Sequence, residues 1–84
     1  MKNELIIEHV GVVSSRGHKL WVNLTCGNDT RQVCYVRYSN AYTWEDGDKE
    51  PEMPTELRDA FHGIQGEKAL QKCARTGETQ ILTV

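Results

Sequence analysis

The sequence predicts an α+β fold, in which a small antiparallel β-sheet (a β-meander) carries one or two short helices on one face, in the order β-β-β-α-α-β. Three observations support this fold class. Apolar and polar residues alternate over two segments, 19–26 and 31–40, which flank a turn-forming sequence. After residue 55 the apolar residues recur with the period of a helix. The chain ends on a short apolar segment, 79–84, which we expect to form a strand.

The first forty residues contain the three strands of the predicted meander, 5–40. The first strand, "LIIEHVGVV" (5–13), is rich in β-branched residues and ends at a loop in which Gly17 favours a reversal. The second, "KLWVNLTC" (19–26), alternates cleanly and therefore has one apolar face. The residues of that face are Leu20, Val22, Leu24 and Cys26.

The turn "GNDT" decides how the third strand, 31–40, pairs with the second. A three-residue loop at 28–30 sets Leu24 opposite Cys34 and joins the apolar sets, whereas a two-residue loop mixes the faces. Since a shift of one residue turns every side chain to the other face, we predict the three-residue loop. The third strand then directs the following residues to the core: Cys34, Val36 and Tyr38.

A helical segment is predicted at 55–76. Pro51 and Pro54 cannot lie inside a helix, so we expect it to begin near Thr55, with Thr55 as the N-cap. Glycines divide the segment into two short helices, the second at 67–75, and Gly77 ends it. The inward face of the first helix follows the i, i+3, i+4, i+7 pattern of Leu57, Ala60, Phe61 and Ile64.

Acidic residues concentrate in a predicted loop, 43–54, and the thirteen residues from Trp44 through Glu56 include six acids in a chain of net charge −2. An aromatic anchor beside exposed acids is typical of a surface that docks a basic partner. A simpler interpretation is that these acids only solvate a loop, while Glu56 and Asp59 stabilise the helix start. The predicted partner-binding residues are Trp44, Glu45, Asp46 and Asp48.

We expect no metal site, no cofactor and no disulfide. Four acids of the loop have the alternate spacing of a calcium loop, but Pro51 stands where the turn needs Gly and Leu57 where a bidentate Glu is needed. The three Cys and three His form no close pairs of the kind that bind zinc. An odd number of cysteines favours free thiols.

A nucleic-acid interface is the alternative. One face of the predicted hairpin would combine aromatic rings that can stack on bases with basic residues that can hold phosphates. The negative net charge argues against it, since nucleic-acid-binding domains usually have a stronger basic footprint. The candidate residues are Trp21, Tyr35, Arg37, Arg31 and Lys19.

The sequence contains no nucleotide-binding loop and no nucleophile motif, so we predict a protein that is not an enzyme. We interpret it as a small cytoplasmic regulator, adaptor or inhibitor that binds another protein, a class that includes products of phages and other mobile elements. A membrane segment is not expected, because no apolar run approaches about 20 residues. The terminal segment 79–84 either forms a homodimer through its free edge or pairs with the meander of its own chain.

Overall fold

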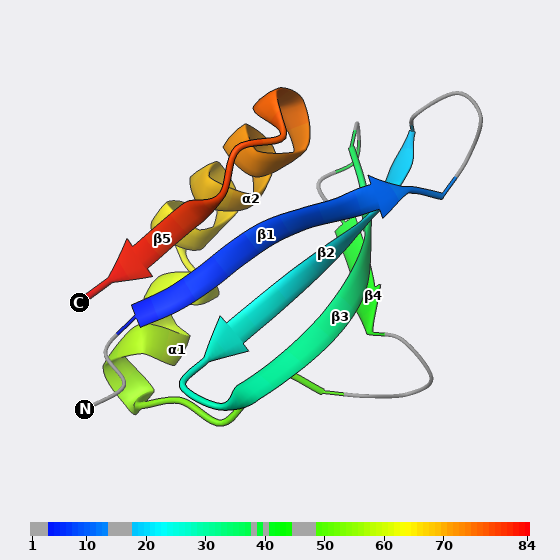
Figure 1. Ribbon diagram of the computed structural model, residues 1–84. Coiled ribbons are helices and arrows are strands. Elements are labelled where there is room, and N and C mark those ends of the chain that lie inside the picture. Colours follow the sequence, from blue (N-terminus) through cyan, green and yellow to red (C-terminus); the bar gives the residue numbers. More distant parts are fainter. Residues whose placement is uncertain (1–3, 14–17, 38, 40, 45–48) are drawn as a thin grey trace.

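The computed structural model describes residues 4–13, 18–37, 39, 41–44 and 49–84. In this part of the chain the sheet has five antiparallel strands in the order β4-β3-β2-β1-β5, and two helices accompany it (Figure 1). The predicted α+β class is therefore confirmed, with one strand more than expected. The elements are β1 (Glu4–Val12), β2 (Lys19–Cys26), β3 (Asp29–Val36), β4 (Ala41–Trp44), α1 (Thr55–Phe61), α2 (Ile64–Thr76) and β5 (Gln80–Thr83).

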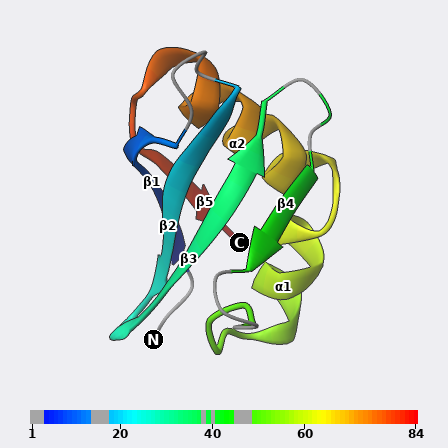
Figure 2. The same ribbon diagram turned by 90° about the vertical axis from the view of Figure 1, so that its right-hand side faces the viewer.

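Both helices pack on one face of the sheet, and they lie behind β1 and β5 in Figure 1. β1, β2 and β3 bury alternate side chains, as an antiparallel sheet with one wet face requires. Figure 2 shows that the sheet twists strongly, so that β4 lies beside the helices. The largest fully buried residues are Tyr35, Leu5, Ile7, Leu20, Leu24, Leu57, Val22, Val33, Pro51 and Cys73.

The β2–β3 hairpin corrects the predicted register. Its turn has two residues, because Cys26 pairs with Asp29, and Gly27 adopts the left-handed φ of 66° that such a turn favours. Val22 therefore pairs with Val33, and Cys34 lies on the outer face of the sheet. The predicted three-residue loop and the predicted burial of Cys34 are therefore wrong. The core residue at this point of β3 is Val33.

β4 is the strand that the sequence did not predict. Thr43 and Trp44, assigned above to the acidic loop, belong to it and pair with Cys34 and Val33 of β3. The segment Ala41–Trp44 is short, but Tyr, Thr and Trp all favour extended structure. The meander thus runs from β1 to β4 before the chain crosses to the helices.

Helix α1 begins at Thr55 as predicted, but Thr55 is not its N-cap. Pro54 occupies that position with φ −59° and ψ 151°, and its carbonyl accepts the N–H of Arg58 at 2.9 Å. The fixed φ of proline suits this extended cap, which has no side-chain hydrogen bond. Ile64, predicted on the inner face of the first helix, starts α2 instead and is 70 % exposed.

The two helices join at a very close contact. Gly66 lies in the first turn of α2, and its Cα packs on the main chain of Phe61 at the end of α1. A Cβ at this position would overlap the Phe61 carbonyl and lie 2.5 Å from its carbon atom. The absence of a side chain at Gly66 therefore sets how closely α2 can follow α1.

The last strand, β5, pairs antiparallel with β1, and Leu82 lies opposite Leu5 in the core. Of the two pairings considered for the terminal segment, the structure shows the one within the chain. Gly77 ends α2 as predicted, with a φ of 77° and an N–H that bonds to the carbonyl of Cys73 at 2.8 Å.

Candidate functional site

Trp44, the predicted docking anchor, is half-buried at the end of β4 and packs against the core. Its ring centroid lies 5.7 Å from that of Tyr42, so the two aromatic residues of β4 support each other. The other predicted partner-binding residues, Glu45, Asp46 and Asp48, lie outside the described residues. Their role stays a prediction.

The aromatic rings proposed for nucleic acid do not share a face. Tyr35 pairs with Leu20 and is 1 % exposed in the core, whereas Trp21 pairs with Cys34 on the outer face. The two-residue turn causes this difference, since it shifts β3 by one residue relative to the predicted register. The predicted common face is therefore wrong, and the stacking platform that depended on it is not formed.

The basic residues of that alternative are also divided. Lys19 alternates outward with Trp21, while Arg31 and Arg37 follow the core side of β3 at its two ends. Arg31 contacts Asp29 at 2.8 Å, and the guanidinium of Arg37 donates to the carbonyl of Ala74 at 2.8 Å. Both arginines thus have structural partners.

A cleft of about 400 Å³ separates β3 and β4 from the junction of the two helices. Three features of the fold form it: the twist that turns β4 toward the helices, the short α1, and the close α1–α2 contact at Gly66 (Figure 2). We call it the β4–helix cleft. Its lining residues are Tyr35, Ser39, Tyr42, Phe61, His62, Gly63, Glu67 and Leu70.

Aromatic rings form one wall of the β4–helix cleft. Tyr42 of β4 contacts Phe61 of α1 edge-on, with 5.9 Å between ring centroids. Phe61 in turn contacts the imidazole of His62 at 5.2 Å. This row links the edge strand to the helix junction and gives the wall an apolar surface with a polar end at His62.

Glu50 fixes the polar end of that wall. One carboxylate oxygen lies 2.9 Å from Nε of Arg58, and the other lies 2.6 Å from Nε2 of His62. Both partners belong to α1 or its C-cap, so Glu50 ties the segment before the helix to the helix itself. Arg58 and His62 are exposed and Glu50 is partly buried, and ion pairs near the surface contribute little to stability individually.

Two carboxylates, Glu67 and Glu50, lie close enough to the tyrosines of the cleft to influence their pKa values. Burial raises the pKa of Tyr35, and the charge of Glu67 raises it further. Burial likewise raises the pKa of Tyr42, with a contribution from Glu50. Both phenols therefore stay neutral at pH 7. Glu67 forms no ion pair with any residue in the described part of the chain.

The cleft contains the residue types of a hydrolase triad but not its geometry. Glu50 orients His62, yet no hydrogen bond joins His62 to Ser39, although both are among the described residues. The Cys73 thiol is buried and bonds to the carbonyl of Ile7 at 3.7 Å. Burial raises the pKa of Cys73, with a contribution from Glu8, so this thiol stays protonated and weakly nucleophilic.

A second groove, of about 420 Å³, lies between the β2–β3 turn and the segment before α1. Its acidic and basic side chains are balanced in number and largely pair with one another, which makes it the weaker candidate for a charged ligand. The charged lining residues are Asp29, Arg31, Lys49, Glu50, Glu52 and Arg58.

Asp29 in this groove gives a pH-dependent prediction. Its carboxylate accepts hydrogen bonds from Arg31 and from the backbone N–H of Glu52, and both lower its pKa. A carboxyl whose pKa is lower in the folded state stabilises the fold above its unfolded pKa of about 3.9, and this contribution is lost as the pH falls through the folded pKa. Asp29→Asn should lower the Tm at pH 7.

The difference in Tm between the wild-type protein and Asp29→Asn should close as the pH falls from about 4 toward 2. Thermal unfolding followed by circular dichroism measures it. Glu52→Gln is the matched control, because it removes a nearby charge and keeps the backbone N–H that bonds to Asp29. A difference that persists unchanged at the lowest pH would show that the ionised carboxylate is not what stabilises this contact.

Within the described ranges, no three His, Cys, Asp or Glu side chains come together as a metal site. Cys26, Cys34 and Cys73, all of which the structure describes, form no disulfide bond. No helix in the described part of the chain has the length and apolarity needed to cross a membrane. Comparison with protein-family models, curated proteins and solved structures found no match to this chain.

The predicted partner-binding residues include Trp44, which neighbours Tyr42 of the cleft, but they include none of the residues that line the cleft itself. Tyr42, Phe61, His62 and Glu67 come from three elements, and their assembly depends on β4. The alternation of Tyr42 and Trp44 around Thr43 was the available signal, since it is typical of a short strand with one aromatic face.

Proposed function

We propose that this chain is a small protein-binding domain, a regulator, adaptor or inhibitor that acts in the cytoplasm by contact and without catalysis. We propose further that it holds a basic segment of its partner in the β4–helix cleft. The observation that carries this proposal is an aromatic-walled cleft beside the edge strand β4 that contains a carboxylate, Glu67, with no ion pair to any other described residue. Three cysteines that form no disulfide bond support an intracellular setting.

A lysine or arginine side chain fits the chemistry of the cleft. Its aliphatic stem can pack on Tyr42 and Phe61, and its charged end can interact with the ring faces and with Glu67. Charge-assisted hydrogen bonds to a carboxylate are among the stronger polar contacts. The acids that follow β4 in the sequence, Glu45, Asp46 and Asp48, have the same sign and favour the same partner.

The edge of β4 supplies a way to hold the main chain of that segment. β4 pairs only with β3 among the described strands, so its other edge is available for an added strand. Extended peptides commonly bind in this mode, in which backbone hydrogen bonds give affinity and pockets for alternate side chains give specificity. On β4 the core-facing positions are Tyr42 and Trp44, and a strand added here would direct alternate side chains toward the cleft.

Selection of random ten-residue peptides on the immobilised protein tests this function. We expect the selected peptides to be enriched in Lys and Arg at alternate positions. In an ¹⁵N NMR titration, the strongest binder should shift the amide signals of β4 and of the α1–α2 junction. Selected peptides without basic residues, or signals that shift only elsewhere, would contradict the proposal.

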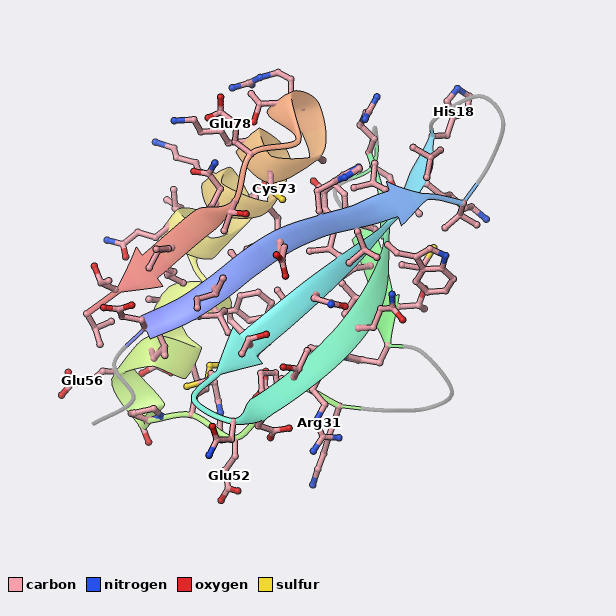
Figure 3. The ribbon with its side chains drawn as sticks, in the orientation of Figure 1. His18, Arg31, Glu52, Glu56, Cys73 and Glu78 are labelled. Carbon is pink, nitrogen blue, oxygen red and sulfur yellow. The ribbon has the colours of Figure 1, made fainter. Side chains whose placement is uncertain are left out.

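Glu67→Gln gives a quantitative prediction for the same site. Loss of a charge-assisted contact of about 1.4 kcal/mol should weaken binding of the selected peptide about tenfold. The fold should be unchanged, because Glu67 is exposed and forms no ion pair with another described residue. Glu78→Gln is the matched control: it removes one charge just beyond the far end of α2 (Figure 3). Isothermal titration at two salt concentrations measures both. Equal affinities for the two variants would rule out Glu67 as the contact.

A further inference from the structure

The outer face of the sheet, the side away from the helices, has apolar residues where solvent-facing residues are expected. An antiparallel sheet with one wet face normally alternates apolar-in and polar-out. Here the outward positions include Trp21, which is half-buried, and Ile81, which is 58 % exposed. No helix or strand of the described chain covers this face (Figure 1). Its apolar residues are Ile6, Val10, Trp21, Cys34, Val36 and Ile81.

Trp21 lies near the centre of this face. Its row across the sheet consists of Gly11 in β1, Trp21 in β2, Cys34 in β3 and Thr43 in β4. A Cβ built on Gly11 would meet no atom within 4 Å, so open space lies directly beside the indole. The face thus offers both a large aromatic side chain and a shallow site that could receive one.

Charged residues are placed symmetrically about Trp21. Along β2 the outward residues run Lys19, Trp21 and Asn23, and Asn23 pairs with Glu8 of β1. Lys19 and Glu8 are therefore displaced from the Trp21 row in opposite directions, each by two residues or about 7 Å. Both are exposed. One side of the Trp21 row is basic and the other is acidic, so the face is complementary to a rotated copy of itself.

We infer that the outer face binds a second copy of this chain, in a two-fold dimer whose sheets pack face to face. A two-fold axis that runs across the strands close to Trp21 exchanges the two sides of its row. It sets Glu8 of each copy opposite Lys19 of the other and brings the two Trp21 rings together, as an isologous interface requires. Packing of two sheets about 10 Å apart is an established arrangement for such faces. The β4–helix cleft lies on the other side of the sheet and stays accessible.

Charge exchange tests this inference without relying on an apolar substitution that could unfold the protein. Glu8→Lys and Lys19→Glu each place like charges opposite each other in the homodimer, and each should raise the dimer dissociation constant about tenfold or more. An equimolar mixture of the two variants restores opposite charges in a heterodimer and should recover the mass of a dimer. Ile64→Glu, on exposed surface at the start of α2, is the control and should leave the dimer intact.

The measurement is light scattering at about 10 to 100 µM protein and about 50 mM salt, where screening is modest. We expect the wild-type protein to have twice the chain mass of 9.6 kDa. In a Trp44→Phe background, dilution should shift the fluorescence of Trp21 to longer wavelength as the dimer dissociates.

A wild-type mass of one chain throughout would overturn the inference. The inference would also be overturned if Glu8→Lys and Lys19→Glu each dimerised as well alone as in the mixture. That result is expected if the dimer formed through the β5 edges instead. A single-stranded oligonucleotide that binds the monomer and shifts the Trp21 signal would assign the face to nucleic acid and also overturn it.

Discussion

Gly66→Ala is expected to destabilise the protein by about 3 kcal/mol, at the upper end of the usual cost of forcing an extra group into a packed interior. The added Cβ would overlap the main chain of Phe61, and backbone atoms cannot rotate away as a flexible side chain can. To accommodate it, α2 would have to move away from α1, which would disturb Leu70 and the α1–α2 junction that forms the β4–helix cleft. We therefore expect peptide binding to weaken together with stability.

Urea unfolding at low micromolar concentration measures the effect, with Gly11→Ala as the matched control. A Cβ at Gly11 meets nothing within 4 Å, so this second substitution should change the free energy of unfolding by no more than about 0.5 kcal/mol. For a domain of this size, a loss of 3 kcal/mol corresponds to a decrease in Tm of roughly 12 to 24 °C. If Gly66→Ala unfolded at the same urea concentration as the control, the two helices would have to be separable at little cost.

The helices and the fold class were predictable because their signals are local. The spacing of Leu57, Ala60 and Phe61, the prolines before residue 55 and Gly77 after α2 act within one or two turns, and the structure shows helices there. The cap at Pro54 was missed for a related reason. Side-chain capping was the only device considered, although proline can adopt the required conformation through its ring alone.

The candidate site was less predictable, because it depends on contacts between residues far apart in the sequence. Tyr42 and Glu67 line the same β4–helix cleft only because β4 pairs with β3 and because α2 follows α1 so closely. Neither condition has a strong local signal. The predicted site residues after Trp44 were chosen because they are acidic. The cleft in the structure is lined by residues before Trp44 and by residues of the helices.

The register of β3 gives the second large prediction. Val33→Asp should unfold the protein, because Val33 is fully buried in the core beside its cross-strand partner Val22. An unpaired carboxylate there costs more than about 4 kcal/mol. Cys34→Asp changes the next residue, which is half-buried on the outer face, and should cost about 1 kcal/mol or less. Adjacent positions should thus differ by several kcal/mol for the same new side chain.

This contrast distinguishes the two hairpin registers directly. In the three-residue loop inferred from the pattern, Cys34 faces the core and Val33 faces solvent, so the sensitivities would be reversed. The error came from weighing Cys34, Val36 and Tyr38 as one apolar face, when Val33 and Tyr35 make an equally apolar one and a Gly at position 27 favours the tighter turn. Circular dichroism and urea unfolding of the two variants at low micromolar concentration, where the proposed dimer is dissociated, measure the difference. If Val33→Asp folded and Cys34→Asp did not, the hairpin would have the three-residue loop. Tyr35 would then lie on the same face as Trp21.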